Sequence, residues 1–393
     1  MTKIFYVDRY VSHSINQFES MLDLTKNEKI ELKFLGPEKG FPYSNSKIQN
    51  NIKKIWKDRH YVRKFYNYFK INKPDIVHFT FETNSFGSVK AAFKLPILLF
   101  LTHRLKIKII FTLRTLVVIK SDSKWIIPDY VPYKIPDFLL KILLKIFVKT
   151  ICHFSDKVIV ETEENKEFLM EFYGIDEEKI QILLFIGTSS SPKSLNVKKM
   201  EELKGKFLGK KIILCFGVIS PRKGLDGVIK AFEKIHKTIP DHILVIAGTV
   251  VNEIKNYQNS LHEMIKEYNL EEKVKFTGYL DYEQVDILFK MAKMAIFNYQ
   301  QMPGSPGAVV YALEQKTPCI VTKTRPFREI FGKNGALYVN ERNEIELSDT
   351  IYKLASDSNI REELKIETQK IAEKLTWEQS SIKLLEIYKK CIE

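Results

Sequence analysis

Gly304–Thr322 reads Gly-Ser-Pro-Gly-Ala-Val-Val-Tyr-Ala-Leu-Glu-Gln-Lys-Thr-Pro-Cys-Ile-Val-Thr, an order that predicts a loop, a short helix and a strand. Ser305 is a favoured helix cap, and Pro306 suits the first helical position, where its missing N–H costs nothing. The N–H groups of Gly307 and Ala308 would then lie at the positive end of the helix dipole, where a phosphate can approach closely.

Glu314 follows Gly307 by seven residues, so the two positions share one helical face. A carboxylate there would reach a polar group beside the phosphates, such as a ribose hydroxyl. An ordinary capped helix packed on a sheet is the alternative interpretation of the same pattern.

A second segment, Leu214–Asp226, reads Leu-Cys-Phe-Gly-Val-Ile-Ser-Pro-Arg-Lys-Gly-Leu-Asp. It predicts a buried strand, a glycine-containing turn and a helix start, with Arg222 and Lys223 adjacent in the turn before Gly224. The order matches neither the Walker loop nor the dinucleotide-binding glycine pattern.

Together the two segments resemble the C-terminal domain of family 4 glycosyltransferases, which have the GT-B fold of two Rossmann-like domains. That family shows a strand, a glycine, a short loop and Lys-Gly, and further along a glycine-rich helix start that ends in Glu. The intervening strands at Leu244–Gly248 and Val274–Tyr279 also fit. The resemblance covers roughly residues 155–345.

The chain departs from the family pattern at two positions. Val218 stands where the family usually has an arginine after the strand glycine, and Arg222 is a candidate to replace it. Pro306 stands where the family usually has the first of two glutamates, which contacts donor sugar hydroxyls. The identity of the sugar therefore stays open.

The resemblance implies an α/β GT-B enzyme that transfers a sugar from a UDP- or GDP-linked donor, with retention of configuration and without a metal or other cofactor. The implied acceptor is a saccharide or a polyprenyl-linked saccharide. Lys223 and Arg222 would stabilise the leaving diphosphate, and Glu314 would hold the ribose. The implied donor-binding residues are Gly217, Gly248, Thr249, Tyr279, Ser305, Gly307, Ala308 and Glu314.

The acceptor side has fewer signals. The family commonly has a histidine after the fourth strand of the first domain, and Arg114 stands at about that place. An arginine there would hold a phosphate or an acidic sugar and is a candidate catalytic residue. A surface arginine at a strand end is the alternative. The glycine-rich loop often found after the first strand is replaced by Asp8–Ser14.

Two other functions stay open at this point. The missing glutamate and the altered first-domain loops are compatible with a non-catalytic relative that binds a nucleotide-sugar or a glycan. Another GT-B chemistry, such as that of a phosphorylase or an epimerase, is the second alternative.

Strands and helices alternate through both halves of the chain, which predicts parallel sheets covered on both faces. We expect an acceptor-side domain over residues 1–186 and a nucleotide-sugar-binding domain over 187–375. The final helix, 376–393, would cross back to the first domain. The linker is expected at 187–193. The expected strands are 4–7, 31–35, 76–81, 107–112, 157–160, 212–216, 243–247, 274–276, 294–297, 319–321 and 336–339.

Composition indicates a globular protein, since 45% of the 393 residues are hydrophobic. The four cysteines are widely spaced and suit a reducing compartment better than a disulfide or zinc set. The chain begins directly with a predicted strand, and no apolar run approaches the roughly 20 residues of a membrane span. We expect a cytoplasmic protein.

Charge is concentrated in the first domain. Residues 1–155 hold 27 Lys and Arg against 12 Asp and Glu, a net charge of +15. The predicted helix 136–153 carries Lys141, Lys145 and Lys149 on one stripe beside many leucines and isoleucines, and 95–101 is a second apolar patch. Two interpretations explain this helix equally well. It binds an anionic membrane surface on the cytoplasmic face, or it is a core helix with one solvated edge.

Nucleic acid is the least favoured partner. Ile55–Tyr66 is basic and rich in aromatics, as a stacking groove would be. Helical spacing instead predicts that Trp56 and Phe65 pack inward while the cations are solvated. The chain contains no complete nucleic-acid-binding motif.

Overall fold

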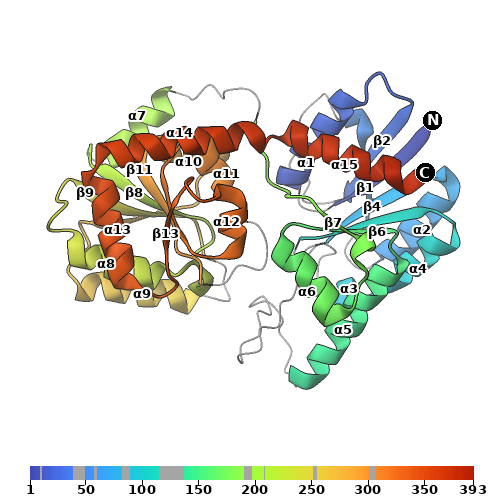
Figure 1. Ribbon diagram of the computed structural model, residues 1–393, viewed down its shortest axis with the longest axis horizontal. Coiled ribbons are helices and arrows are strands. Elements are labelled where there is room, and N and C mark those ends of the chain that lie inside the picture. Colours follow the sequence, from blue (N-terminus) through green and yellow to red (C-terminus); the bar gives the residue numbers. More distant parts are fainter. Residues whose placement is uncertain are drawn as a thin grey trace. The chain divides into compact units, whose positions relative to one another are not determined.

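The computed structural model describes residues 1–8, 11–38, 49–56, 60–81, 89–114, 137–189, 197–207, 209–250, 255–300 and 306–393. The chain forms two compact units (Figure 1). The N-terminal unit comprises Met1–Gly187 and Trp377–Glu393, and the C-terminal unit comprises Thr188–Met302 and Pro306–Thr376. Each unit contains one sheet, and the strand pairings of both sheets are parallel, so the α/β fold class expected from the sequence is confirmed.

The N-terminal sheet has the strand order β3-β2-β1-β4-β5-β6-β7. Its strands are β1 (Thr2–Val7), β2 (Ile30–Pro37), β3 (Ile52–Trp56), β4 (Ile76–Phe81), β5 (Lys108–Leu113), β6 (Lys157–Val160) and β7 (Ile180–Ile182). The helices of this unit are α1 (Val11–Leu24), α2 (Tyr61–Asn72), α3 (Val89–Ala92), α4 (Leu95–Arg104), α5 (Asp137–Phe154), α6 (Glu163–Tyr173) and α15 (Trp377–Ile392). Every residue of β4 is buried, because helices cover both faces of a parallel sheet.

Two strands of this sheet, β3 and β7, were not expected from the sequence. Trp56 ends β3, so the expected helical spacing from Trp56 to Phe65 is wrong at Trp56. Pairing of β3 with the end of β2 overrides the local pattern, as tertiary contacts often do for short strands. Phe65 lies on α2 and is buried, as expected.

Helix α15 packs on the N-terminal sheet beside α1 (Figure 1). Leu384 and Tyr388 of α15 are buried in one hydrophobic cluster with Tyr6 of β1. The hydroxyl of Tyr388 lies 2.6 Å from Nδ1 of His78, whose Nε2 lies 2.7 Å from the hydroxyl of Thr112. Burial lowers the pKa of His78 to about 3, so the imidazole is neutral and each nitrogen needs a polar partner.

The C-terminal sheet has the strand order β10-β9-β8-β11-β12-β13. Its strands are β8 (Lys211–Phe216), β9 (His242–Ala247), β10 (Val274–Gly278), β11 (Ala292–Phe297), β12 (Cys319–Thr322) and β13 (Leu337–Val339). Its helices are α7 (Val197–Lys206), α8 (Leu225–Ile235), α9 (Lys255–Glu267), α10 (Tyr282–Met291), α11 (Val309–Glu314), α12 (Arg325–Phe331), α13 (Glu344–Ser356) and α14 (Ser358–Lys374).

The 3₁₀ turns are η1 (Gln49–Asn51), η2 (Glu177–Lys179) and η3 (Pro221–Lys223). In the part of the chain that the structure describes, no helix is both long and apolar enough to cross a bilayer. The expected linker is described only as far as Ser189, and its remainder lies outside the described residues.

We predict that Tyr388→Phe destabilises the N-terminal unit. The substitution keeps the ring but leaves a buried imidazole nitrogen of His78 without this partner, which costs about 1–3 kcal/mol. The unfolding midpoint of this unit in urea should fall. Tyr352→Phe, on the half-exposed surface of α13, is the matched control and should leave the midpoint unchanged. Equal midpoints for the two variants would show that the Tyr388–His78 contact does not hold α15.

Candidate functional site

The strand order of the C-terminal sheet reverses between β8 and β11, since β9 and β10 extend to one side and β12 and β13 to the other. Open parallel sheets bind ligands at the carboxyl ends of their strands, at such a switch point. Lys223 follows β8, and Asn298 and Tyr299 follow β11, so these residues lie at this point.

Two glycines shape the turns at this edge. Gly217 follows β8 with φ +125°, and Gly248 follows β9 with φ +136°, a region that favours glycine. A Cβ atom on Gly217 would lie 2.9 Å from Nζ of Lys223, and one on Gly248 would overlap the carbonyl oxygen of Gly217. Both glycines are therefore required for the two turns to pack together and for the lysine to fold back over β8.

The η3 turn that carries the two cations is bonded to the chain after β11. Nδ2 of Asn298 donates to the carbonyl oxygen of Gly224 at 2.9 Å. The backbone N–H of Gln300 donates to the carbonyl oxygen of Arg222 at 2.9 Å. Gly224 adopts φ +59°, and a Cβ atom there would clash with Asn298. This glycine therefore permits the η3 turn to pack closely against the chain after β11.

Lys223 is nearly buried, with an exposed fraction of 9%. Its Nζ donates a hydrogen bond to the hydroxyl of Tyr299 and lies 3.9 Å from the centre of that ring. Burial, and then the neighbouring charge of Arg222, lower the pKa of Lys223 to about 7. Near pH 7 the amino group is therefore only partly protonated, and an approaching anion would favour its charged form. Arg222 itself is exposed.

The predicted helix start after β11 differs from the expectation. Helix α11 begins at Val309 and not at Pro306, because Pro306 and Gly307 form tight turns whose carbonyl groups accept from Val309 and Val310. Ser305, the expected cap, lies outside the described residues. Ala308 occupies the cap position without a side-chain hydrogen bond.

Glu314 is the last residue of α11, and its Oε1 accepts a hydrogen bond of 2.9 Å from the backbone N–H of Ser189. The carboxylate thus holds the chain at the start of the C-terminal unit. Its predicted contact with a ribose stays a prediction.

The remaining predicted donor residues directly follow β9 and β10. The N–H of Gly248 donates to the carbonyl oxygen of Gly278 at 3.1 Å, and the carbonyl oxygen of Thr249 accepts from Ile219 at 2.9 Å. Tyr279 is 76% exposed, so its ring is accessible to a ligand base. These contacts place Gly248 and Thr249 at the same carboxyl edge as Lys223.

Arg114 lies in the N-terminal unit, after the carboxyl end of β5. Its guanidinium is buried, lies 3.8 Å from the carboxylate of Asp8 and stands 5.0 Å from the centre of the Phe185 ring. Asp8 follows β1, which borders the switch point of this sheet between β1 and β4. The arginine is therefore an interior residue rather than a surface one, and its predicted contact with donor or acceptor stays a prediction.

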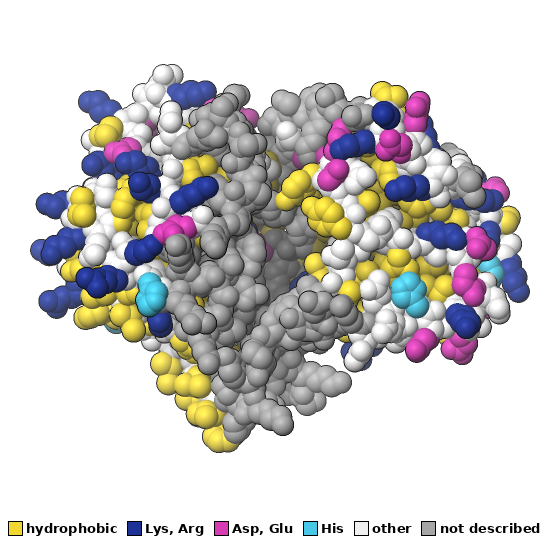
Figure 2. All heavy atoms as spheres, turned by 180° about the vertical axis from the view of Figure 1, so that it is seen from behind, with side chains coloured by type: hydrophobic (Ala, Val, Ile, Leu, Met, Phe, Trp, Pro, Cys, Tyr) yellow, Lys and Arg dark blue, Asp and Glu magenta, His cyan; other side chains and the backbone are white. Residues whose placement is uncertain are grey.

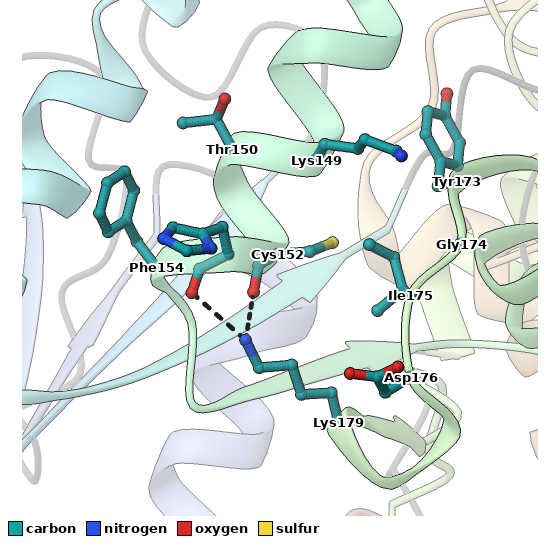
Figure 3. A pocket seen from close by; sticks show the side chains of 10 residues that line it. Lys149, Thr150, Cys152, Phe154, Tyr173, Gly174, Ile175, Asp176 and Lys179 are labelled. Atoms are coloured by element: carbon teal, nitrogen blue, oxygen red, sulfur yellow. Dashed lines mark hydrogen bonds between the residues drawn. The ribbon is translucent and has the colours of Figure 1, made fainter.

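A pocket of about 550 Å³ also lies in the N-terminal unit, between the ends of α5 and α6 (Figure 3). Nζ of Lys179 donates to the carbonyl oxygens of Cys152 and His153 at 2.8 and 3.2 Å, and so caps α5. The pocket is at the amino end of β6, whereas Arg114 is at the carboxyl edge. Within the described ranges, no three His, Cys, Asp or Glu side chains are arranged to hold a metal ion.

Sequence reasoning missed Tyr299, Asn298 and the pairing of Asp8 with Arg114. The one available signal for Tyr299 and Asn298 is their place directly after a buried strand, where parallel sheets carry ligand-binding residues. The contact between Tyr299 and Lys223 joins segments that are far apart in the chain, so no local sequence pattern predicts it.

Comparisons with known proteins identify the family and the fold of the chain. Residues 31–183 match the model described as Glycosyltransferase Family 4, and residues 196–371 match the one described as Glycosyl transferases group 1. O-antigen chain mannosyltransferase RfbU of Salmonella typhimurium is 25% identical over 239 residues, which are 60% of this chain and 62% of that protein. Mannosylfructose-phosphate synthase of Agrobacterium fabrum is 26% identical over 204 residues, 50% of this chain and 44% of that protein.

The matches thus span less than two thirds of the length of these two relatives. Among solved structures, HepE of Anabaena in complex with UDP-glucose has a TM-score of 0.74 at 13% identity, covering 99% of this chain and all of that one. At such identity the likeness concerns the fold, and it confirms the predicted GT-B arrangement of two Rossmann-like sheets. With both halves matched, the chain belongs to the glycosyltransferases of the family 4 type.

Proposed function

We propose that this protein transfers a sugar from a nucleotide-sugar donor to a hydroxyl group of a saccharide or lipid-linked saccharide, with retention of configuration. The observation that carries the proposal is the position of Lys223. A nearly buried amino group lies at the switch point of a parallel sheet, behind two glycine turns. Such a group is suited to bind a diphosphate, because the negative charge of the ligand would compensate for the hydration that the amino group lost on burial.

The barrier in this reaction is the departure of a nucleoside diphosphate from a sugar carbon that becomes positively charged. Lys223 and Arg222 would stabilise the negative charge that grows on the diphosphate, together with the backbone N–H groups of Gly307 and Ala308. The acceptor would attack from the face that the diphosphate leaves, and no metal takes part in this scheme.

The donor is proposed to be UDP- or GDP-linked. Tyr279 would cover the base, and Glu314 would hold the ribose. A carboxylate accepts several hydrogen bonds, so its bond to Ser189 does not exclude a ribose hydroxyl. The names of the relatives favour a hexose such as mannose or glucose.

A screen of UDP-glucose, UDP-galactose, UDP-N-acetylglucosamine and GDP-mannose tests the proposal. Release of nucleoside diphosphate that increases with an added saccharide acceptor supports a transferase. Binding without turnover would support a non-catalytic relative instead. A change in the sugar of the free donor would support an epimerase.

We also propose that the N-terminal unit attaches peripherally to an anionic membrane. The second half of α5 is in the core, where Phe147, Val148 and Ile151 are buried. The first half is apolar and exposed. Phe93, just before α4, contacts Phe147, and Phe100 of α4 contacts Phe154, so the exposed side of α4 lies beside the second half of α5. The exposed apolar residues of this face are Phe93, Ile97, Phe100, Phe138, Leu139, Ile142, Leu143 and Ile146.

In Figure 2 hydrophobic side chains gather at the lower end of the N-terminal unit, and Lys and Arg side chains crowd its outer side. The exposed Lys145 and Lys149 border the apolar face of α5. Apolar side chains beside lysines are typical of a helix at a membrane interface. The net charge of +15 over residues 1–155 complements anionic lipid and would bring the enzyme to a lipid-linked acceptor.

Loss of Lys223 should impair the chemical step more than donor binding. We expect Lys223→Ala to lower kcat by about 100-fold or more, the scale for a leading electrostatic stabiliser. Lys234→Ala, an exposed lysine on α8, is the matched control and should keep normal kcat. Transfer at the wild-type rate by folded Lys223→Ala would remove this lysine from the site.

Glu314→Ala should mainly weaken donor binding. A hydrogen bond to a charged group contributes about 1.5–3 kcal/mol, so the KM for the donor should rise while kcat changes little. Steady-state kinetics at several donor concentrations separates the two effects. An unchanged KM would mean that Glu314 serves only to hold Ser189.

Liposome sedimentation tests the membrane proposal. Wild type should pellet with anionic vesicles at low salt and be released by high salt, since each lysine near the surface contributes about 1 kcal/mol. Replacing Lys141, Lys145 and Lys149 by Glu should reduce pelleting and leave donor hydrolysis intact. Replacing Lys234, Lys237 and Lys266 by Glu is the control: it changes the net charge equally, but on the C-terminal unit, and should not reduce pelleting. Wild type that stays in the supernatant at low salt would refute the attachment.

A further inference from the structure

Tyr299 is the group in closest polar contact with the amino group of Lys223. Its hydroxyl accepts the hydrogen bond from Nζ, and its side chain is only 4% exposed. Burial raises the pKa of Tyr299 well above its usual range, so the residue stays a phenol and acts as a neutral acceptor. The pair is therefore a hydrogen bond from the lysine amino group to a neutral hydroxyl, and not an ion pair.

The position of Tyr299 is fixed from several sides. The hydroxyl of Thr322, at the end of β12, donates to its carbonyl oxygen at 3.0 Å. Its ring packs against Phe297 of β11 at 6.1 Å and Phe327 of α12 at 5.5 Å between ring centres. Because the neighbouring strands and α12 hold the ring, its hydroxyl is a rigid reference point for the flexible lysine side chain.

We propose that Tyr299 is a positioning residue for Lys223, holding its amino group at the switch point until the diphosphate of the donor takes over that hydrogen bond. The inference rests on the proposed function, because it assigns Lys223 to a diphosphate. The buried hydroxyl compensates part of the hydration that the amino group lost on folding, and it keeps the group aimed at one place.

This arrangement makes diphosphate binding depend on pH in a defined direction. The pKa of Lys223 without ligand is about 7, so the amino group carries its charge below pH 7 and loses it above. A bound diphosphate favours the charged form, so binding above pH 7 must take up a proton and weakens as pH rises. Among the residues that the structure describes, the other titratable groups that act on Nζ are Arg222 on the same turn and Cys215 of β8. Burial raises the pKa of the Cys215 thiol to about 12, so it stays neutral over this range.

Calorimetric titration of the full chain with UDP and with GDP between pH 6 and pH 9 tests the inference. For wild type, the Kd of the diphosphate that binds should rise by up to about tenfold per pH unit above pH 7. Tyr299→Phe keeps the ring and removes the acceptor, so the ammonium form of Lys223 is less favoured. The bend in the curve should move to lower pH, and binding at pH 7 should weaken about fivefold to tenfold with greater proton uptake.

Two variants make the result specific. Lys223→Gln should lose the bend and retain only the titration of the ligand's own phosphate, which has a pKa of about 6. Tyr61→Phe removes another buried hydroxyl, which donates to the carbonyl oxygen of Ala91 at 2.8 Å in the N-terminal unit. It should lower the unfolding midpoint and leave the pH curve at the wild-type position.

The outcomes separate the two claims. If neither UDP nor GDP binds wild type, the proposed function fails and this inference fails with it. If binding depends on Lys223 but Tyr299→Phe follows the wild-type curve, Tyr299 is a packing residue and the inference alone is overturned. A thermal unfolding scan checks that both Tyr→Phe variants are folded.

Discussion

The contact between the backbones of Gly217 and Gly248 is the constraint on which the proposed donor site depends. A Cβ atom on Gly248 would overlap the carbonyl oxygen of Gly217, and one on Gly217 would crowd Nζ of Lys223. The two turns can therefore adopt this packing only without side chains. This packing places the lysine over the end of β8, within reach of the residues that follow β11.

Burial of Lys223 costs stability, and the surrounding contacts offset only part of it. An amino group without its water is driven toward the neutral form, and one phenol hydroxyl replaces a fraction of the lost hydration. A buried ionisable group that costs folding stability is typical of functional sites, where it is retained for binding or catalysis. The buried pair of Arg114 and Asp8 is the corresponding feature of the N-terminal unit.

Periodicity was sufficient to predict the α/β class, because buried strands such as β8 contain unbroken apolar runs, here Ile212–Phe216. The resemblance to family 4 glycosyltransferases predicted the GT-B fold. The edge strands β3 and β7 were not predicted, because pairing with a neighbouring strand and not local composition defines them. Lys223 could be predicted as a candidate site residue because glycines mark its turn. Its partner Tyr299 could not be found, because the contact joins the ends of β8 and β11, which only the strand order brings together.

Helix α15 belongs to the N-terminal unit although the whole C-terminal unit precedes it in the chain. Leu384 and Tyr388 complete the cluster that includes Tyr6 and Phe18. During synthesis on the ribosome, the first half of the protein therefore emerges with this apolar surface uncovered. It can reach its final packing only after α15 has been translated. Emergence of α15 from the ribosome, rather than completion of residues 1–187, then sets the time at which the N-terminal core closes.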